Sequence, residues 1–418
     1  MLSSATVATI RRSSTAVLTC VAIMIMANAA RVEASAPSSQ VVYGQQITNH
    51  RAAVFSPGGN AALRSLVSGG PGLETIGPDG TFWTCTQSGT LIAVPAKTTT
   101  LFGVAAQANR AMSLVPAGAL SPSVFSQQVG ECLGTFVDSA GNLYMTNWTS
   151  NSITVIPTKT TTLYGQRVTA NTPTTFNPGG TGRLGTLLNT WPAQNPKNPS
   201  VLQAGAPDQI VEDASGNLFI AVQGPDQVIV IAKKRSPIFG QAFLANTPSV
   251  LAAATAGIYQ VDSLGFDNFG DLLIGDYNAT PTSSETAHIG VLAASTHKLF
   301  GQRLTANTFA LLNPGGHGAL TKALGSGGGG QFVFTKAGDL LAVAYTQGVL
   351  VAIPGPSTHR LFGQGVSPST PVRLNPWRSG LSDLLQGSST YGLVLSAPGS
   401  LLISNQGQPG RIIVLAGP

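Results

Sequence analysis

The sequence predicts an all-β fold, a six-bladed β-propeller in which every blade is a four-stranded antiparallel sheet. Three observations lead to this prediction. A segment related to residues 299–316 (LFGQRLTANTFALLNPGG) occurs six times, three short apolar runs separate successive copies, and the two ends of the chain carry complementary parts of one unit.

The repeated segment is marked by the glycine that follows its aromatic residue. This glycine recurs at intervals of 59 to 75 residues, and a period of that size is typical of repeat architectures. The six copies of the glycine are Gly44, Gly103, Gly165, Gly240, Gly301 and Gly363. We therefore expect residues 35–418 to form a single domain.

The apolar runs between the copies have the composition of β-strands. In the second unit they are CLGTFVD, NLYMTN and SITVIP, within residues 132–157. Runs rich in Val, Ile, Leu, Phe and Thr that end at Gly, Asn, Asp or Pro indicate strands. Residues 138–141 (DSAG) supply the turn chemistry of a hairpin between the first two runs. The TTLFG part of the repeated segment is expected to be the fourth strand.

The two ends of the chain predict how the ring closes. The chain begins with a lone fourth strand at residues 40–43, and its last unit has only three runs, the last at 411–415. Pairing these two segments would complete the last blade and remove a free sheet edge. An open solenoid would instead need capping units.

The N-terminus has the pattern of an export signal. Arg11 and Arg12 precede an apolar stretch at residues 15–30, and small-residue cleavage sites follow it. A membrane anchor would need about 20 apolar residues, so a cleaved signal peptide at 1–34 is favoured. The mature protein is then expected to be secreted, periplasmic or at the cell surface, with no stable membrane span.

Charge and cysteine content narrow the classes of partner. Only 9% of residues are charged, the net charge is +6, and no basic stripe is present, so nucleic acid is not expected as a partner. Cys85 should end a strand of the first blade and Cys132 should begin one of the second, on the same face. An exported protein can oxidise such a pair, so a disulfide is predicted.

A known family resembles these repeats. The block DxxGNLYxxNxxxNxI at residues 138–153 resembles the NHL repeat, and the FGQxxTAN segment is similar to the linker of secreted bacterial NHL-repeat proteins. The resemblance covers nearly all of the expected mature chain. The Asp usual before the second-to-third hairpin is kept only as Asp276, which weakens transfer of functional residues.

Acidic side chains are expected at one end of the central channel. Aligned on the turn glycine, Asp208 and Asp262 occupy one position in the first strands of neighbouring blades, and Glu131 and Asp276 fall near the same end. Such oxygen ligands suit Ca²⁺. Similarity to six-bladed gluconolactonases and paraoxonases implies a channel calcium and a lactonase-like or lyase-like activity. The other explanation is that the carboxylates accept backbone N–H groups or bind water.

The long connections between blades suggest a binding surface. They run to roughly 25–40 residues, and loops longer than about 15 residues are usually functional or disordered. The longest contains Trp191, while Asn147 and Asn405 close second strands on the same face. No GxSxG, HExxH or P-loop motif occurs, so no catalytic residue is assigned. The leading hypothesis is an exported, non-enzymatic propeller whose loop face contacts a protein, peptide or glycan.

Overall fold

The computed structural model describes residues 38–189, 205–252, 258, 260–276, 287–316, 318–325, 329–345, 347–376, 379–385, 389–407 and 409–417. Apart from Ser38 and Ser39, these residues belong to one unit, Gln40–Pro418. The predicted signal peptide, 1–34, lies outside the described residues, so export stays a prediction.

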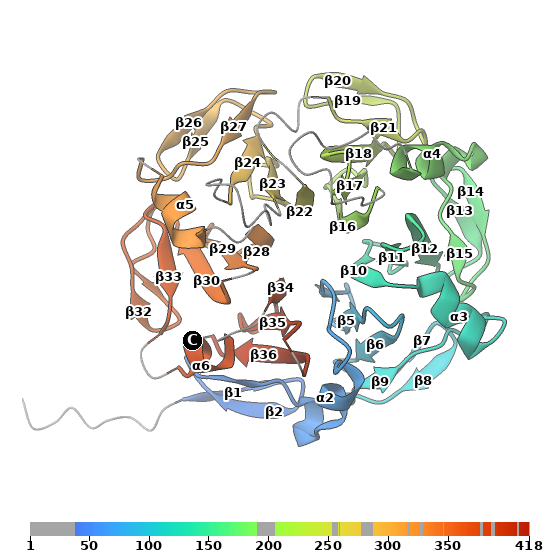
Figure 1. The fold of residues 1–418 in the computed structure, drawn as a ribbon, viewed down its shortest axis with the longest axis horizontal. Helices are drawn as coiled ribbons and strands as arrows, with labels where there is room; N and C mark the ends of the chain where they lie inside the picture. Colours follow the sequence, from blue (N-terminus) through green and yellow to red (C-terminus); the bar gives the residue numbers. More distant parts are fainter. Residues whose placement is uncertain are drawn as a thin grey trace, which may run out of the picture. The chain divides into compact units, whose positions relative to one another are not determined.

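Six four-stranded antiparallel sheets are arranged as blades around a common centre, in chain order (Figure 1). This confirms the predicted fold class. The strands, from the centre outwards, are: blade 1, β4 (Thr75–Ile76), β5 (Phe82–Cys85), β6 (Leu91–Val94) and β9 (Met112–Ser113); blade 2, β10 (Cys132–Val137), β11 (Leu143–Asn147), β12 (Ser152–Ile156) and β15 (Thr174–Thr175); blade 3, β16 (Pro207–Glu212), β17 (Leu218–Val222), β18 (Gln227–Ile231) and β21 (Ser249–Val250); blade 4, β22 (Val261–Phe266), β23 (Leu272–Asp276), β24 (Ile289–Leu292) and β27 (Phe309–Leu311); blade 5, β28 (Gly329–Phe334), β29 (Leu340–Ala344), β30 (Val349–Ile353) and β33 (Val372–Leu374); blade 6, β34 (Thr390–Leu395), β35 (Leu401–Asn405), β36 (Arg411–Leu415) and β3 (Ala52–Val54).

The repeated segment is not the fourth strand, contrary to the prediction. Each copy folds into a separate two-stranded sheet, which we call a rim hairpin, and the fourth strand follows it. The rim hairpins are β1 (Ser39–Val42) with β2 (Gln45–Thr48), β7 (Thr99–Leu101) with β8 (Val104–Ala106), β13 (Thr161–Leu163) with β14 (Gln166–Val168), β19 (Ser236–Ile238) with β20 (Gln241–Phe243), β25 (His297–Leu299) with β26 (Gln302–Leu304), and β31 (Arg360–Leu361) with β32 (Gln364–Gly365).

Ring closure follows the predicted principle with a different strand. The N-terminal part of the chain does complete the last blade, but β3 pairs with β36, with Ala53 opposite Val414. Residues 40–43 instead belong to a rim hairpin. The predicted strand was wrong because the repeated segment forms the rim hairpin, and the fourth strand of each blade is the next segment of the chain.

The turn of the rim hairpin explains the repeated aromatic–glycine pair. In the rim hairpin of blade 2, formed by β13 and β14, Tyr164 has φ 45° and Gly165 has φ 79°. Leu163 pairs with Gln166 across these two residues. Two consecutive residues with positive φ define a type I′ turn, which suits the twist of a hairpin. The aromatic residue is held in this unusual conformation while its hydroxyl donates to the carbonyl of Gly216, 2.7 Å away.

The repeated glutamine ties each rim hairpin to its blade. Gln166 donates to the carbonyl of Thr175 (2.8 Å) and accepts from the N–H of Asn177 (2.7 Å). Gln45, Gln241, Gln302 and Gln364 make the equivalent pair of contacts. The FGQ motif is therefore structural.

Short helices connect most fourth strands to the next blade. They are η1 (Pro57–Gly59), α2 (Ala62–Leu66), α3 (Pro122–Val129), η2 (Pro178–Gly180), α4 (Arg183–Asn189), α5 (Ala319–Leu324) and α6 (Leu381–Leu385). α3 and α6 contact the end of the second strand through Asn147 and Asn405, whose amides donate to carbonyls of Gln128 and Leu384. Among the described residues, no helix has the length and apolar character needed to cross a bilayer.

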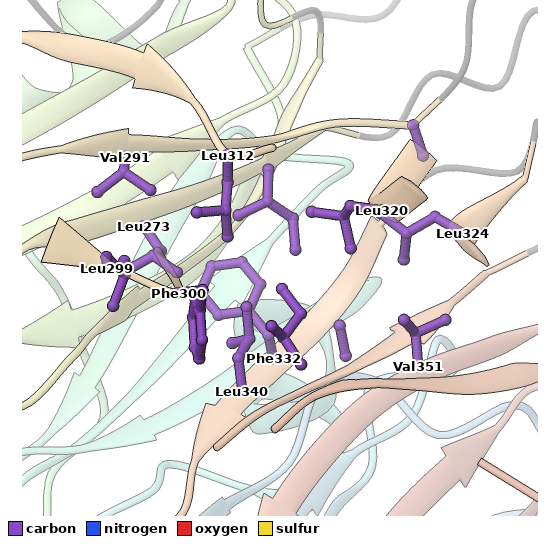
Figure 2. Close-up of a cluster of buried hydrophobic side chains, with 14 of the residues drawn as sticks. Leu273, Val291, Leu299, Phe300, Leu312, Leu320, Leu324, Phe332, Leu340 and Val351 are labelled. Atoms are coloured by element: carbon purple, nitrogen blue, oxygen red, sulfur yellow. The ribbon is translucent and has the colours of Figure 1, made fainter. Parts of the chain in front are cut away.

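The core lies between neighbouring blades. Figure 2 shows the cluster between blades 4 and 5, where Leu273 and Val291 of one blade face Phe332 and Leu340 of the other. Phe300 of the rim hairpin packs into the same cluster and is only 6% exposed. Burial of one such side chain stabilises a fold by about 1.5–3 kcal/mol, so the rim hairpins are part of the core.

Blades 1 and 2 are also joined covalently. A disulfide links Cys85, at the end of β5, to Cys132, at the start of β10, with their Cα atoms 5.9 Å apart. Both residues are fully buried. The bond crosses the boundary between two blades next to the central channel.

Candidate functional site

Three bulges direct polar side chains into the centre of the propeller. The first strands of blades 2 to 6 all lose register with the second strand at this level, and in blades 3, 4 and 6 the shifted positions hold Asp208, Asp262 and Tyr391. A bulge re-aims a side chain. Blades 3 and 6 lie opposite each other in a ring of six, yet Tyr391 contacts Asp208, so the two side chains meet across the channel.

Asp208 is the centre of this cluster. The Tyr391 hydroxyl donates to Asp208 Oδ1 at 2.6 Å and lies 2.8 Å from Oδ2. Gln223 Nε2 donates to Oδ2 at 2.5 Å. The Asp262 carboxyl is within hydrogen-bonding distance of the same group. Asp208, a residue singled out from the sequence, is thus contacted by its own blade and by blades 4 and 6.

The carboxyls of Asp208 and Asp262 are buried side by side, and this raises the pKa of both. Burial raises the pKa of Asp208 to about 7. Burial, followed by the charge of Asp208, raises the pKa of Asp262 well above its usual range. Neither oxygen of Asp262 meets an N–H or O–H donor among the described residues, which a proton on Asp262 itself explains, because that proton can be donated to Asp208. Two adjacent carboxylates cannot both ionise readily.

A small cavity lies beside this pair, at what we call the channel mouth. It has a volume of about 100 Å³ and is lined by Gln87, Leu133, Trp148, Gln223, Tyr345, Tyr391 and Gln406. Trp148, Gln223, Tyr345 and Gln406 occupy one equivalent position, directly after the second strand of their blades. Since liquid water takes about 30 Å³ per molecule, the cavity suits a group of a few heavy atoms.

The other two predicted acidic residues are engaged elsewhere. Asp276 is fully buried; its Oδ1 accepts the N–H of His288 at 2.8 Å, and its Oδ2 lies 3.4 Å from His288 Nδ1. Glu131 Oε2 accepts from the Thr149 hydroxyl at 3.2 Å. No three of the four predicted acidic residues place ligand atoms within 4.8 Å of one another. The structure therefore brings Asp208 and Asp262 together and leaves Glu131 and Asp276 with other partners, and calcium binding stays a prediction.

Two of the remaining predicted binding residues make structural contacts, and the third lies outside the described residues. Asn147 and Asn405 are 1% and 0% exposed, and each amide oxygen accepts a backbone N–H, from Ser150 and Gly407. Their side chains close loops and do not reach a surface. Trp191 lies outside the described residues.

Sequence analysis missed the residues that complete the channel mouth. Tyr391 falls at the same distance from its turn glycine as Asp208 and Asp262, so the alignment already contained it. Glu74, further along the channel, was also missed. It is fully buried, and burial raises its pKa to about 8, partly offset by a hydrogen bond with Ser404.

Comparisons with known proteins find similar structures only at low sequence identity. No protein-family model and no curated protein matches the sequence. Among solved structures, a virginiamycin B lyase from Staphylococcus aureus is similar (10% identity, TM-score 0.44), with 88% of this chain and 99% of that chain covered. An aldose sugar dehydrogenase from Streptomyces coelicolor (12%, 0.48, 91% and 98%) and a gluconolactonase from Xanthomonas campestris (11%, 0.45, 84% and 87%) are also similar. The six four-stranded blades of the structure itself show that the chain is a six-bladed β-propeller.

Proposed function

We propose that this protein is a binding propeller whose channel mouth takes a small organic cation, such as an ammonium head group. The observation that carries the proposal is the buried Asp208–Asp262 pair, which lies one hydrogen bond behind the wall of the cavity. Tyr391 and Gln223 both line the cavity and donate to Asp208. No Lys or Arg is among the described residues of the lining.

The walls of the cavity suit a cation with an apolar body. Trp148, Tyr345 and Tyr391 present aromatic rings, and a cation within about 6 Å of such a ring gains roughly 0.5–2 kcal/mol. The rings of Tyr345 and Tyr391 pack edge to face, 5.6 Å apart, which fixes part of the wall. A strongly hydrated metal ion gains less from aromatic walls and lacks the six to eight oxygens that Ca²⁺ prefers.

A bound cation competes with protonation of Asp208. Positive charge in the cavity stabilises the ionised form of Asp208, so it lowers the pKa of that carboxyl and favours release of its proton, while Asp262 stays protonated. Because the pKa of Asp208 in the free protein is about 7, affinity for a cation should rise as the pH increases through 7.

The proposal is tested by thermal unfolding with choline and with its uncharged isostere, 3,3-dimethylbutan-1-ol. Choline should raise the melting temperature, more at pH 8 than at pH 6, whereas the isostere and CaCl₂ should not. Trp148→Leu and Asp208→Asn should remove the effect. Equal shifts with choline and the isostere would contradict the cation proposal, and a shift specific to calcium would restore the metal hypothesis.

A second function, acid–base catalysis, is favoured by one specific observation. Two carboxyls are buried side by side, and one of them has a pKa near 7, which is the value that suits a general acid or base at neutral pH. A lactonase-like hydrolase or a lyase acting on a small substrate would use Asp208 and Asp262 in these roles. Turnover of a lactone panel that is abolished by Asp262→Asn would support it, and unchanged turnover would exclude this pair.

We further propose that the chain is a divergent NHL-repeat propeller that is exported and contacts a larger partner. The disulfide between Cys85 and Cys132 supports an oxidising compartment. A protein or peptide partner on the loop face could place an amine in the channel mouth. Mass spectrometry of the mature N-terminus and capture with the full-length protein, with and without excess choline, test these two points.

A further inference from the structure

The turn between the first two strands of blade 4 differs from its counterparts in blades 2 and 3. In blade 3, Asp213 Oδ1 accepts the N–H groups of Ser215 and Asn217, and Asn217 Nδ2 donates to Asp213 Oδ2 at 2.7 Å. Blade 2 has the same arrangement, with Asn142 Nδ2 donating to Asp138 Oδ2 at 2.8 Å. In both turns the two oxygens of the Asp carboxylate therefore have hydrogen-bond donors within the turn.

Blade 4 keeps this frame but replaces the donor with an acceptor. Asp267 Oδ1 accepts the N–H groups of Phe269 and Asp271 at 2.8 and 2.9 Å, as in the other blades. The position of the asparagine is Asp271, whose Oδ1 accepts the N–H of Ala294 at 2.8 Å. Among the described residues, Asp267 Oδ2 and Asp271 Oδ2 have no hydrogen-bond donor apart from the imidazole of His297, whose Nε2 lies near Asp271 Oδ2. The two residues are only 8% and 0% exposed.

A histidine completes the group. His297 Nε2 lies 3.0 Å from Asp271 Oδ2, and the ligand atoms of Asp267, Asp271 and His297 all lie within 4.8 Å of one another. His297 Nδ1 lies 3.0 Å from the carbonyl of Ser295. A proton on Nδ1 that is donated to this carbonyl leaves the Nε2 lone pair directed at the two carboxylates, which is the arrangement of metal-binding histidines. Rim hairpins of blades 2 and 3 have Thr161 and Ser236 at the position of His297.

We infer that Asp267, Asp271 and His297 form a binding site for a divalent transition metal ion, of which Zn²⁺ is the best match. One imidazole and two carboxylate oxygens are common zinc ligands, and a cation would supply the missing partner of both buried oxygens. Asp267 also lines a groove of about 720 Å³ between blades 3 and 4, so water can supply a fourth ligand. The ring of Phe269 stacks on His297 with centroids 4.4 Å apart and covers the imidazole.

This site is separate from the channel mouth. Its three residues belong to the first-to-second turn and the rim hairpin of blade 4, whereas the channel mouth is formed at the opposite ends of the first strands. Blade 5 offers an internal control. There Thr335 takes the place of Asp267, and its hydroxyl donates to Asp339 Oδ2 at 2.7 Å. His359, at the position of His297, therefore has only one carboxylate beside it, and that carboxylate already has a donor.

The test is calorimetric titration of the full-length, tag-free, chelator-treated protein with ZnCl₂. One ion should bind per chain, X-ray absorption at the zinc edge should show a single imidazole ligand, and the melting temperature should rise. Asp271→Asn rebuilds the Asp–Asn pair of blade 3 and should weaken binding by roughly tenfold or more while the protein stays folded. His297→Thr should do the same.

The control His359→Thr should bind Zn²⁺ as the wild type does. Absence of zinc binding to the wild-type protein would overturn the inference, because it would show that His297 pairs with the carboxylates as a cation instead. Binding that is unchanged in both Asp271→Asn and His297→Thr would also overturn it, because the ion would then lie elsewhere.

Discussion

The rim hairpins and the channel mouth use repetition in opposite ways. In all six rim hairpins the aromatic residue and the glycine have positive φ, and five of them keep the glutamine clamp. At the channel mouth the equivalent positions of different blades carry a tryptophan, a tyrosine and two glutamines. The hairpins show what every blade needs in order to pack, and the mouth shows where the blades have been free to differ. We therefore place function where the repeats diverge.

The largest expected effect concerns Glu74 in the central channel. It tests whether burying an ionisable side chain there lowers the free energy of unfolding at high pH. Burial raises the pKa of Glu74 from an ordinary value of 4.5 to about 8 in the folded protein, so its contribution to stability is complete below pH 4.5 and is lost as the pH rises through 8. Glu74→Gln cannot ionise. At pH 9 it should be more stable than the wild type by up to about 5 kcal/mol, from about 1.4 kcal/mol per pKa unit.

Chemical denaturation at pH 4.5 and pH 9 measures this difference. The two proteins should have similar free energies of unfolding at pH 4.5 and diverge at pH 9. If the wild type kept its full stability at pH 9, the channel carboxyl would not be held in its neutral form by burial.

The disulfide tests whether the mouth depends on a bond between blades. Cys85 and Cys132 are separated by 47 residues, and closing a loop of that length stabilises a fold by about 4 kcal/mol in the chain-entropy model. The double variant Cys85→Ser, Cys132→Ser should lose most of this stability and bind choline more weakly. Two free thiols by mass spectrometry of the unreduced wild type would refute the bond.

The smallest expected effect concerns the rim. Gly165 and Gly301 both have φ near 80°, but a Cβ at Gly165 would lie 3.3 Å from the Cα of Gly179, whereas nothing lies within 4 Å at Gly301. Both alanine variants should be destabilised by about 1–2 kcal/mol from backbone strain, and Gly165→Ala should be the less stable of the two.

Neither variant should alter the affinity for choline relative to the wild type under conditions where both are folded. A change in choline affinity that accompanied the loss of stability would show that the rim hairpins and the channel mouth are coupled. It would contradict the assignment of packing to the rim hairpins and of binding to the channel mouth. Thermal melts and titrations of the same samples provide both quantities.

Most of the fold could be predicted because the inner strands obey local rules. Strands such as Leu143–Asn147, and the turns with Asp and Gly that precede them, can be predicted from residue composition alone. The fourth strands were missed because they are short: β9 is two residues, Met112–Ser113, and no periodicity shows in so few. The rim hairpin was mistaken for a strand because its type I′ turn has an aromatic residue where Asn or Asp is usual.

The candidate site could be predicted only where it follows the repeat. Asp208 and Asp262 were found by alignment on a glycine, and Tyr391 could have been found in the same way. The contact between Tyr391 and Asp208 depends on blades 183 residues apart in sequence facing each other across the ring. Asp276 was grouped with the channel carboxylates, but it contacts His288 at the end of the adjacent strand. No sequence pattern predicts this pair.

Proton release on cation binding tests the central claim most directly. Choline is titrated into the wild type at pH 7 in two buffers with different ionisation enthalpies, and the difference in heat gives the number of protons released. Because burial raises the pKa of Asp208 into the neutral range, the account predicts a net release of protons when choline binds and none for Asp208→Asn. Binding with no proton release, or the same release from Asp208→Asn, would contradict the proposal that the buried pair senses the cation.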